Sequence, residues 1–424
     1  MKQETTYEVN EKRILTALGE IDDQYIEEAE DIKKPHIKSS FPMIAAAALI
    51  AAVALFAFLR LLPAGPDAPG TKNSADPASD GPSSASGLPL LTARFDTETG
   101  MGFEGMMYYD ISEAENGNPW TEEQALSSLP VYRNRACTDM GGITVFLNED
   151  EMSDLAARTA DALAASIENT TYQRISDITE QPPAGHDGTE AYSLTAETAL
   201  GEITVYGNGQ IRIFFSEPVT LPEEYRFTSS ETTDDEAGEI LRYLTGRYQA
   251  LCAFDQPAYC TGGDYTYSGE RIRFYQAYDS SGDLTQQILN YNFNNISFSP
   301  DDDGNLFIIW SGDLLTAAEK VGDYPLIDAE TARCLLLNGD YITTVPSEYL
   351  RDGTITEPQI AKTELVYRTG NTEELFMPYY RFYVKLTDYS TDMAEGLICY
   401  GAYYVPAVSG EYLSDFPVWG GRFN

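Results

Sequence analysis

Residues 203–215 read Ile-Thr-Val-Tyr-Gly-Asn-Gly-Gln-Ile-Arg-Ile-Phe-Phe (ITVYGNGQIRIFF). The runs Ile203 to Tyr206 and Ile211 to Phe215 are rich in the β-branched and aromatic residues that favour strands. Between them, Gly207-Asn208-Gly209 is a tight-turn signature. The stretch therefore predicts a β-hairpin, and with it antiparallel strand pairing.

Helices and strands alternate on both sides of this hairpin. Acidic residues in the first turn, which the helix dipole favours, mark the start of the first of three predicted helices. The three helices run from Asn148 to about Ile167, from a Thr233 cap to about Leu251, and from Asp328 to Leu337. Further strands are predicted at 172–178, 191–198, 271–278, 285–292, 294–299, 306–310, 362–368, 378–386 and 397–405. Three units of a helix followed by antiparallel strands indicate an α+β ectodomain, and the pattern leaves open whether the units share one sheet.

A strongly apolar run precedes this part of the chain. Residues 41–59 carry no charge, and at about 1.5 Å per residue a helix of that length approaches the thickness of a bilayer core. A cleaved signal peptide would begin nearer the N-terminus, and a buried helix is the other alternative. Because Lys33, Lys34 and Lys38 precede the run and Arg60 alone follows it closely, we expect a single-pass anchor with a cytoplasmic N-terminus.

The residues after the run are small, polar and rich in proline, which is typical of a flexible spacer. The predicted domains, listed in chain order, are a cytoplasmic head (1–40), a transmembrane helix (41–62), a linker (63–92) and three ectodomain units (93–220, 221–312 and 313–424, the last rich in tyrosine).

Composition limits the partners. The chain has 424 residues, a formal net charge of −40 and 12 % aromatic residues. Nucleic acid and anionic lipid would be repelled by this charge. The apolar fraction of 43 % is sufficient for a buried core.

Three short motifs have both a chemical and a structural interpretation. Gly100 to Gly105 matches GxGxxG, but strand-like residues follow it, whereas a dinucleotide site needs a helix there. Asp301 to Asn305 is rich in oxygen ligands, yet it lacks the calcium-loop spacing and separates two strands, which favours a hairpin turn. Cys252 and Cys260 are close enough to form a disulfide, although buried thiols are the favoured interpretation.

Catalytic motifs are missing from the sequence. There are two histidines, and only His186 belongs to the predicted ectodomain, so a multi-histidine metal site is excluded there. We find no GxSxG, HExxH, SxxK or Walker sequence. We therefore expect no cofactor and no enzymatic activity, with a carboxylate-based wall hydrolase as the enzymatic alternative.

Two sets of residues are candidates for partner binding. Leu15, Leu18, Ile21 and Tyr25 recur at helical spacing in the acidic head. Tyr379, Tyr380 and Tyr403 belong to the tyrosine-rich third unit, where adjacent tyrosines place rings on both faces of a sheet. Each set has a second interpretation: the head is an inert start to the anchor, and the tyrosines form a buried sheet face.

The segment from Tyr324-Pro325-Leu326 through Tyr380-Arg381-Phe382-Tyr383-Val384 to Val405-Pro406-Ala407-Val408 resembles uncharacterised membrane-anchored proteins of Clostridia-type Gram-positive bacteria. The layout of head, span and outer domain is similar to that of the YycH and YycI regulators of a cell-wall sensor kinase. The head from Arg13 to Ala29 resembles the N-terminal segment of anti-sigma-factor-like membrane proteins, without the cysteines of the zinc-binding type.

These resemblances imply a regulatory or sensory membrane protein. Its outer domain would bind an envelope partner or ligand, and its head would contact a signalling protein such as a sigma factor or a sensor kinase. The alternative is a membrane-anchored binding or scaffold module with an inert head.

Overall fold

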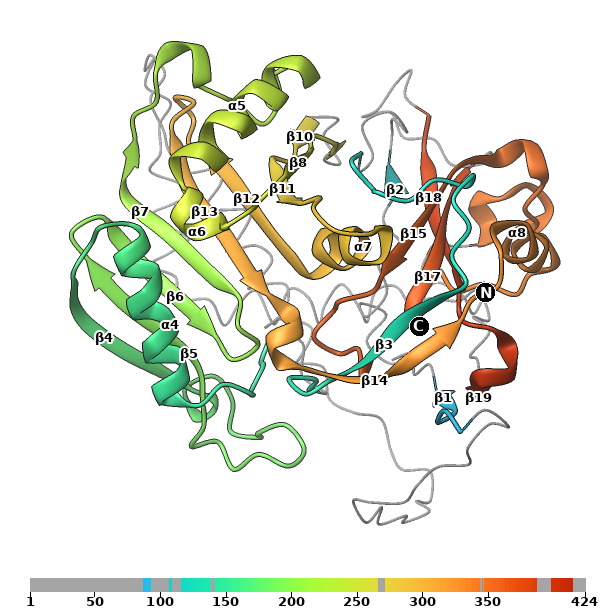
Figure 1. Cartoon of the computed structure of the whole chain (residues 1–424), viewed down its shortest axis with the longest axis horizontal. Coiled ribbons are helices and arrows are strands. Elements are labelled where there is room, and N and C mark those ends of the chain that lie inside the picture. Colours follow the sequence, from blue (N-terminus) through green and yellow to red (C-terminus); the bar gives the residue numbers. More distant parts are fainter. Residues whose placement is uncertain are drawn as a thin grey trace, which may run out of the picture. The chain divides into compact units, whose positions relative to one another are not determined.

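A computed structural model (Figure 1) describes residues 87–92, 107–108, 116–138, 142–265, 271–343, 345, 347–386 and 398–414. The chain divides into residues 1–73 and 74–424, and every described residue belongs to the second unit. The predicted head, the uncharged run 41–59 and most of the linker lie outside the described residues. Within the described residues, no helix has the length and apolar character needed to span a bilayer.

The largest sheet has eight strands, and each neighbouring pair is antiparallel. In spatial order the strands are β4 (Ile167–Arg174), β5 (Ala191–Thr198), β6 (Gly201–Tyr206), β7 (Ile211–Val219), β13 (Leu306–Asp313), β12 (Asn294–Pro300), β11 (Gln276–Asp279) and β8 (Pro257–Cys260). The predicted hairpin at 203–215 is confirmed as the β6–β7 pair, and the turn at Asp301 to Asn305 joins β12 to β13. Strands of the first two predicted units thus form one sheet.

Three helices cover one face of this sheet: α4 (Glu149–Ala162), α5 (Asp234–Arg247) and α6 (Gln249–Cys252). In Figure 1 they lie in front of the strands. Asn148 and Thr233 close capping boxes at the starts of α4 and α5, which explains why the sequence places both starts correctly. The first helix ends earlier than predicted, because Ala164 takes a left-handed conformation and β4 begins at Ile167.

A single hydrophobic cluster joins these helices to the sheet. It contains Met152 and Ala156 of α4, Ile240 and Leu244 of α5, and the inward side chains of the strands. Because side chains alternate between the two faces of a strand, the remaining strand residues lie on the opposite face, which we call the outer face.

The remaining described strands form smaller sheets. One has the order β15 (Ile360–Tyr367), β17 (Pro378–Lys385), β18 (Tyr400–Pro406), β2 (Met107–Tyr108), and another β14 (Ala318–Pro325), β3 (Ser128–Asn134), β16 (Leu375–Phe376). Two short pairs are antiparallel β9 (Gly263–Tyr265) with β10 (Arg271–Arg273) and parallel β1 (Leu91–Thr92) with β19 (Leu413–Ser414). Short 3₁₀ turns occur at Ile175–Asp177, Glu223–Tyr225, Leu314–Ala317, Ser347–Tyr349, Arg351–Gly353, Glu357–Gln359 and Gly410–Tyr412.

The helices α7 (Leu284–Phe293) and α8 (Ala329–Asn338) pack against one face of the four-stranded sheet through a second hydrophobic cluster. The strand predicted at 285–292 is wrong, since these residues form α7. Asp283 caps this helix by accepting a hydrogen bond from the Gln286 N–H at 2.9 Å. An Asp directly before a segment of mixed apolar and amide residues is the helix-start signal that the strand prediction did not take into account.

The turn of the central hairpin makes a close backbone approach at Gly207. Its N–H donates to the Tyr192 carbonyl and its own carbonyl accepts from the Leu147 N–H. A Cβ atom at this position would overlap the Thr144 carbonyl oxygen, whereas one at Gly238 in α5 would meet nothing within 4 Å.

We predict opposite effects on stability for alanine at these two glycines. Gly207→Ala should lower the free energy of unfolding by about 1–3 kcal/mol, because the backbone of residue 144 must move. Gly238→Ala, the matched control, should raise it by about 0.5–1 kcal/mol, because alanine loses less entropy in a helix. Denaturant titration of both variants measures the difference, and equal effects would contradict the packing described for the turn.

Candidate functional site

The structure places Tyr379, Tyr380 and Tyr403 in the interior, with exposed fractions of 2, 4 and 1 %. Tyr380 lies on the face covered by α7 and α8, and its hydroxyl donates to the Ile327 carbonyl at 2.9 Å. Tyr379 lies on the opposite face, in a third hydrophobic cluster. Both faces of this sheet are covered, so the three tyrosines are buried, Tyr380 and Tyr403 on one face and Tyr379 on the other, and they present no surface to a partner. The other candidates, Leu15, Leu18, Ile21 and Tyr25, lie outside the described residues.

Charged side chains are also buried on the Tyr379 face of this sheet. Arg381 pairs with Glu364 across β17 and β15 at 2.7 Å, and Lys362 approaches the same carboxylate at 2.6 Å. Arg381 also lies over the Tyr383 ring, 5.2 Å from its centroid. A carboxylate that already contacts a guanidinium and an ammonium forms a buried ion pair, so this cluster has a structural role between β15 and β17.

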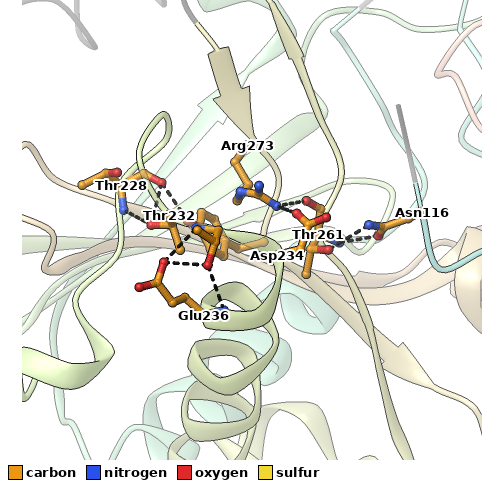
Figure 2. Close-up of polar contacts among 9 residues, drawn as sticks. Asn116, Thr228, Thr232, Asp234, Glu236, Thr261 and Arg273 are labelled. Atoms are coloured by element: carbon orange, nitrogen blue, oxygen red, sulfur yellow. Dashed lines mark hydrogen bonds and ion pairs between the residues drawn. The ribbon is translucent and has the colours of Figure 1, made fainter. Parts of the chain in front are cut away.

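A second buried polar cluster surrounds Arg273 (Figure 2). Its guanidinium donates to the Asp234 carboxylate at the start of α5 and to the Thr261 carbonyl. The Thr261 N–H in turn donates to the Asn116 side chain at 2.6 Å, and the Asn116 amide donates to the Thr261 hydroxyl at 2.8 Å. The Arg273 side chain is 1 % exposed while that of Asp234 is 61 % exposed. The cluster therefore fixes the start of α5 to the segment that follows β8.

The oxygen-rich turn at Asp301 and the single histidine of the predicted ectodomain have structural roles. The Asp301 carboxylate accepts from the N–H groups of Asp303 and Asn305 at 3.0 and 2.6 Å, which stabilises the turn between β12 and β13. His186 Nδ1 lies 3.4 Å from Glu190 Oε1. Within the part of the chain that the structure describes, no group of three or more His, Cys, Asp or Glu side chains is arranged to hold a metal ion.

The outer face of the eight-stranded sheet carries a different set of side chains. One register position crosses seven strands from β4 to β11, and we call these residues the outer row. The outer row is Thr171, Thr195, Thr204, Arg212, Trp310, Ser297 and Gln276. Directly paired residues of neighbouring strands point to the same face. With strands about 4.8 Å apart, the outer row spans roughly 30 Å.

Contacts between these side chains confirm that they share one face. The hydroxyls of Thr195 and Thr204 lie 3.4 Å apart, and Arg212 Nη2 donates to Thr204 Oγ1 at 3.5 Å. The Arg212 guanidinium lies over the Trp310 ring, 5.8 Å from its centroid. Tyr206 stacks on the same indole with ring centroids 5.9 Å apart and an interplanar angle of 13°.

These aromatic side chains are half-buried, and neither Tyr206 nor Trp310 belongs to the four buried hydrophobic clusters of the described chain. Burial raises the pKa of the Tyr206 hydroxyl, and the Arg212 charge acts in the opposite direction. The hydroxyl is therefore protonated at neutral pH and is able both to donate and to accept a hydrogen bond. The row has no signal in the sequence, because its seven members lie on different strands that are separated by connections of different lengths.

No protein-family model matches this sequence, and no curated protein is significantly similar to it. The resemblances described above therefore remain expectations from short motifs.

Cys252 carries a free thiol, so the alternative of a Cys252–Cys260 disulfide is not realised in the structure. Burial raises the pKa of the Cys252 thiol to about 12. Cys334 in α8 is exposed and provides a control.

We predict that iodoacetamide at pH 8 modifies Cys334 but leaves Cys252 unmodified in the folded protein. Only about one Cys252 thiol in 10,000 is ionised at that pH, and the thiolate is the reactive form. Peptide mapping by mass spectrometry distinguishes the two sites, and unfolding in urea should make both react. Rapid labelling of Cys252 before unfolding would contradict its partial burial and its raised pKa.

Proposed function

We propose that this chain is a single-pass membrane protein with a regulatory or sensory role. Its α+β domain would lie outside the cytoplasm and bind an envelope partner or ligand, and its head would contact a signalling protein. The observation that carries the proposal is the order of segments: an uncharged 19-residue run with lysines before it, a proline-rich spacer, and a folded domain whose described part begins at residue 87.

Two features of the folded domain support a binding role. The buried carboxylates of Glu364 and Glu373 each pair with an arginine, at 2.7 and 2.5 Å, so these charged groups are used in structural ion pairs. The outer row instead offers hydrogen-bonding and aromatic groups along the face opposite the helices. The same row also favours the second candidate, a membrane-anchored binding module whose head is inert.

The orientation predicts which cysteines a membrane-impermeant maleimide reaches in intact cells. Cys334 should react, because it is exposed on a domain that we place outside the membrane. A Thr16→Cys substitution in the head, which has no native cysteine, should react only after permeabilisation. Labelling of residue 16 in intact cells, or protection of Cys334, would overturn the proposed topology.

A substitution in the head distinguishes the two proposed roles of this segment. In the first the head contacts a signalling protein, and in the second it is inert. Leu18→Asp places a charge within the stripe Leu15, Leu18, Ile21, Tyr25 and should reduce cross-linking of the head to its cytoplasmic partner by about tenfold or more. Thr16→Asp, which introduces the same charge on the opposite side of a helical projection, should leave the cross-link unchanged.

Cross-linking in intact cells followed by mass spectrometry identifies the partner, for which a sigma factor and a sensor kinase are the expected classes. If deletion of residues 1–30 changes neither the cross-linked proteins nor the downstream transcription, the head is inert and the binding-module alternative holds.

A further inference from the structure

The outer row is a straight series of uncharged hydrogen-bonding side chains interrupted by one guanidinium and one indole. Three threonines lie at its β4 end, and Ser297 and Gln276 lie at its β11 end. Thr204 is buried, at 4 % exposure, and its hydroxyl lies within hydrogen-bond distance of Thr195 and Arg212. The hydroxyls of Thr171, Thr195 and Ser297 are at least partly exposed and can both donate and accept, and the Gln276 amide supplies donors and an acceptor. This chemistry matches that of sugar hydroxyls, which also donate and accept without carrying charge.

The ring pair in the middle of the row supplies the apolar part of such a surface. Tyr206 and Trp310 are nearly parallel, at 13°, and both are partly exposed. Arg212 lies against the Trp310 ring and reaches Thr204 with one nitrogen. Its buried Nε has no hydrogen-bond partner. The C–H faces of a pyranose pack on aromatic rings of this kind, and a guanidinium beside them donates to ring hydroxyls.

Charge beside the row selects against other polymers. Two residues from the Thr195–Thr204 pair, the next pair on the outer face consists of the exposed residues Glu197 and Glu202, directly paired across β5 and β6. Polyanions are repelled by these groups and by the formal net charge of −40. An apolar helix from a protein partner requires a desolvated hydrophobic centre, whereas most positions of the outer row are hydroxyl or amide groups.

We propose that the outer row binds an uncharged, extended oligosaccharide of the cell envelope, with the Tyr206–Trp310 ring pair packing on the C–H groups of a sugar ring and Arg212, Thr195 and Ser297 bonding to its hydroxyls. This inference rests on the proposed function, because it names the ligand of the extracytoplasmic domain. The roughly 30 Å length of the row accommodates several sugar residues in line.

The test uses the full chain in detergent and calorimetric titration with the β-1,4-linked hexamers of N-acetylglucosamine and of glucose. We expect at least one hexamer to bind with a dissociation constant of about 1 mM or tighter. Trp310→Ala should weaken that binding about tenfold or more. Thr195→Val, which keeps the side-chain shape and removes only the hydroxyl, should weaken it severalfold, and so provides a second variant if Trp310→Ala is poorly folded.

Tyr225→Ala is the matched control. Tyr225 stacks on Tyr243 with ring centroids 4.1 Å apart and an interplanar angle of 8°, and Tyr243 packs against the helix-covered core. Removing this stacked tyrosine should leave hexamer binding unchanged. Thermal unfolding of each variant separates lost binding from lost folding.

Three results would overturn the inference: no binding of either hexamer, binding that Trp310→Ala and Thr195→Val leave intact, or preferential binding of polygalacturonate or of a basic peptide. The maleimide labelling of Cys334 tests the proposed topology separately. If the topology is correct but neither hexamer binds, the oligosaccharide is rejected and the proposed membrane topology is retained. If a hexamer binds but the topology is wrong, the sugar-binding surface is retained and the extracytoplasmic placement of the domain is rejected.

Discussion

The antiparallel pairing of β7 with β13 is the interaction on which the eight-stranded sheet depends. Ile213 of β7 faces Ile309 of β13, and nearly a hundred residues of chain separate the two. This pairing joins the β4–β7 strands to the β8, β11, β12 and β13 strands in one sheet. As a result α4 and α5 share a single hydrophobic cluster rather than closing two separate ones.

The same pairing creates the outer row. Arg212 and Trp310 face each other across β7 and β13, so the guanidinium–indole contact forms only where the two groups of strands meet. Threonines on one side of this contact and Ser297 and Gln276 on the other become one continuous series. A surface assembled in this way belongs to the whole sheet, and neither group of strands alone could carry it.

The four-stranded sheet follows a different principle, because both of its faces are buried. Alternation along β17 places Tyr380 and Phe382 toward α7 and α8, and Tyr379, Arg381 and Tyr383 toward the other side. An unpaired charge on the buried Tyr379 face would destabilise the fold, because the charge would lose its hydration. Glu364 supplies the partner of Arg381. The tyrosines thus contribute packing area, with rings in edge contact such as Trp120 on Tyr380 at 5.5 Å.

The sequence by itself determined those helix starts and turns that depend on residues close together in the chain. Capping residues Asn148, Thr233 and Asp328 marked three helix starts, and the glycines around Asn208 marked the hairpin. It also established the α+β class and the antiparallel pairing. It failed at α7, a ten-residue segment in which apolar residues alternate irregularly with Thr, Gln and Asn, and whose start is marked by the Asp283 cap.

Only the tertiary structure decided which faces are covered and which distant strands are neighbours. The alternation of side chains shows which residues of a strand share a face. It does not show which face is buried, because the helices and loops that pack on each face come from elsewhere in the chain. For this reason the tyrosines at 379, 380 and 403 turned out to be interior. The outer row likewise could not be predicted from the sequence. Its seven residues are aligned by hydrogen bonding between strands and not by any spacing along the chain.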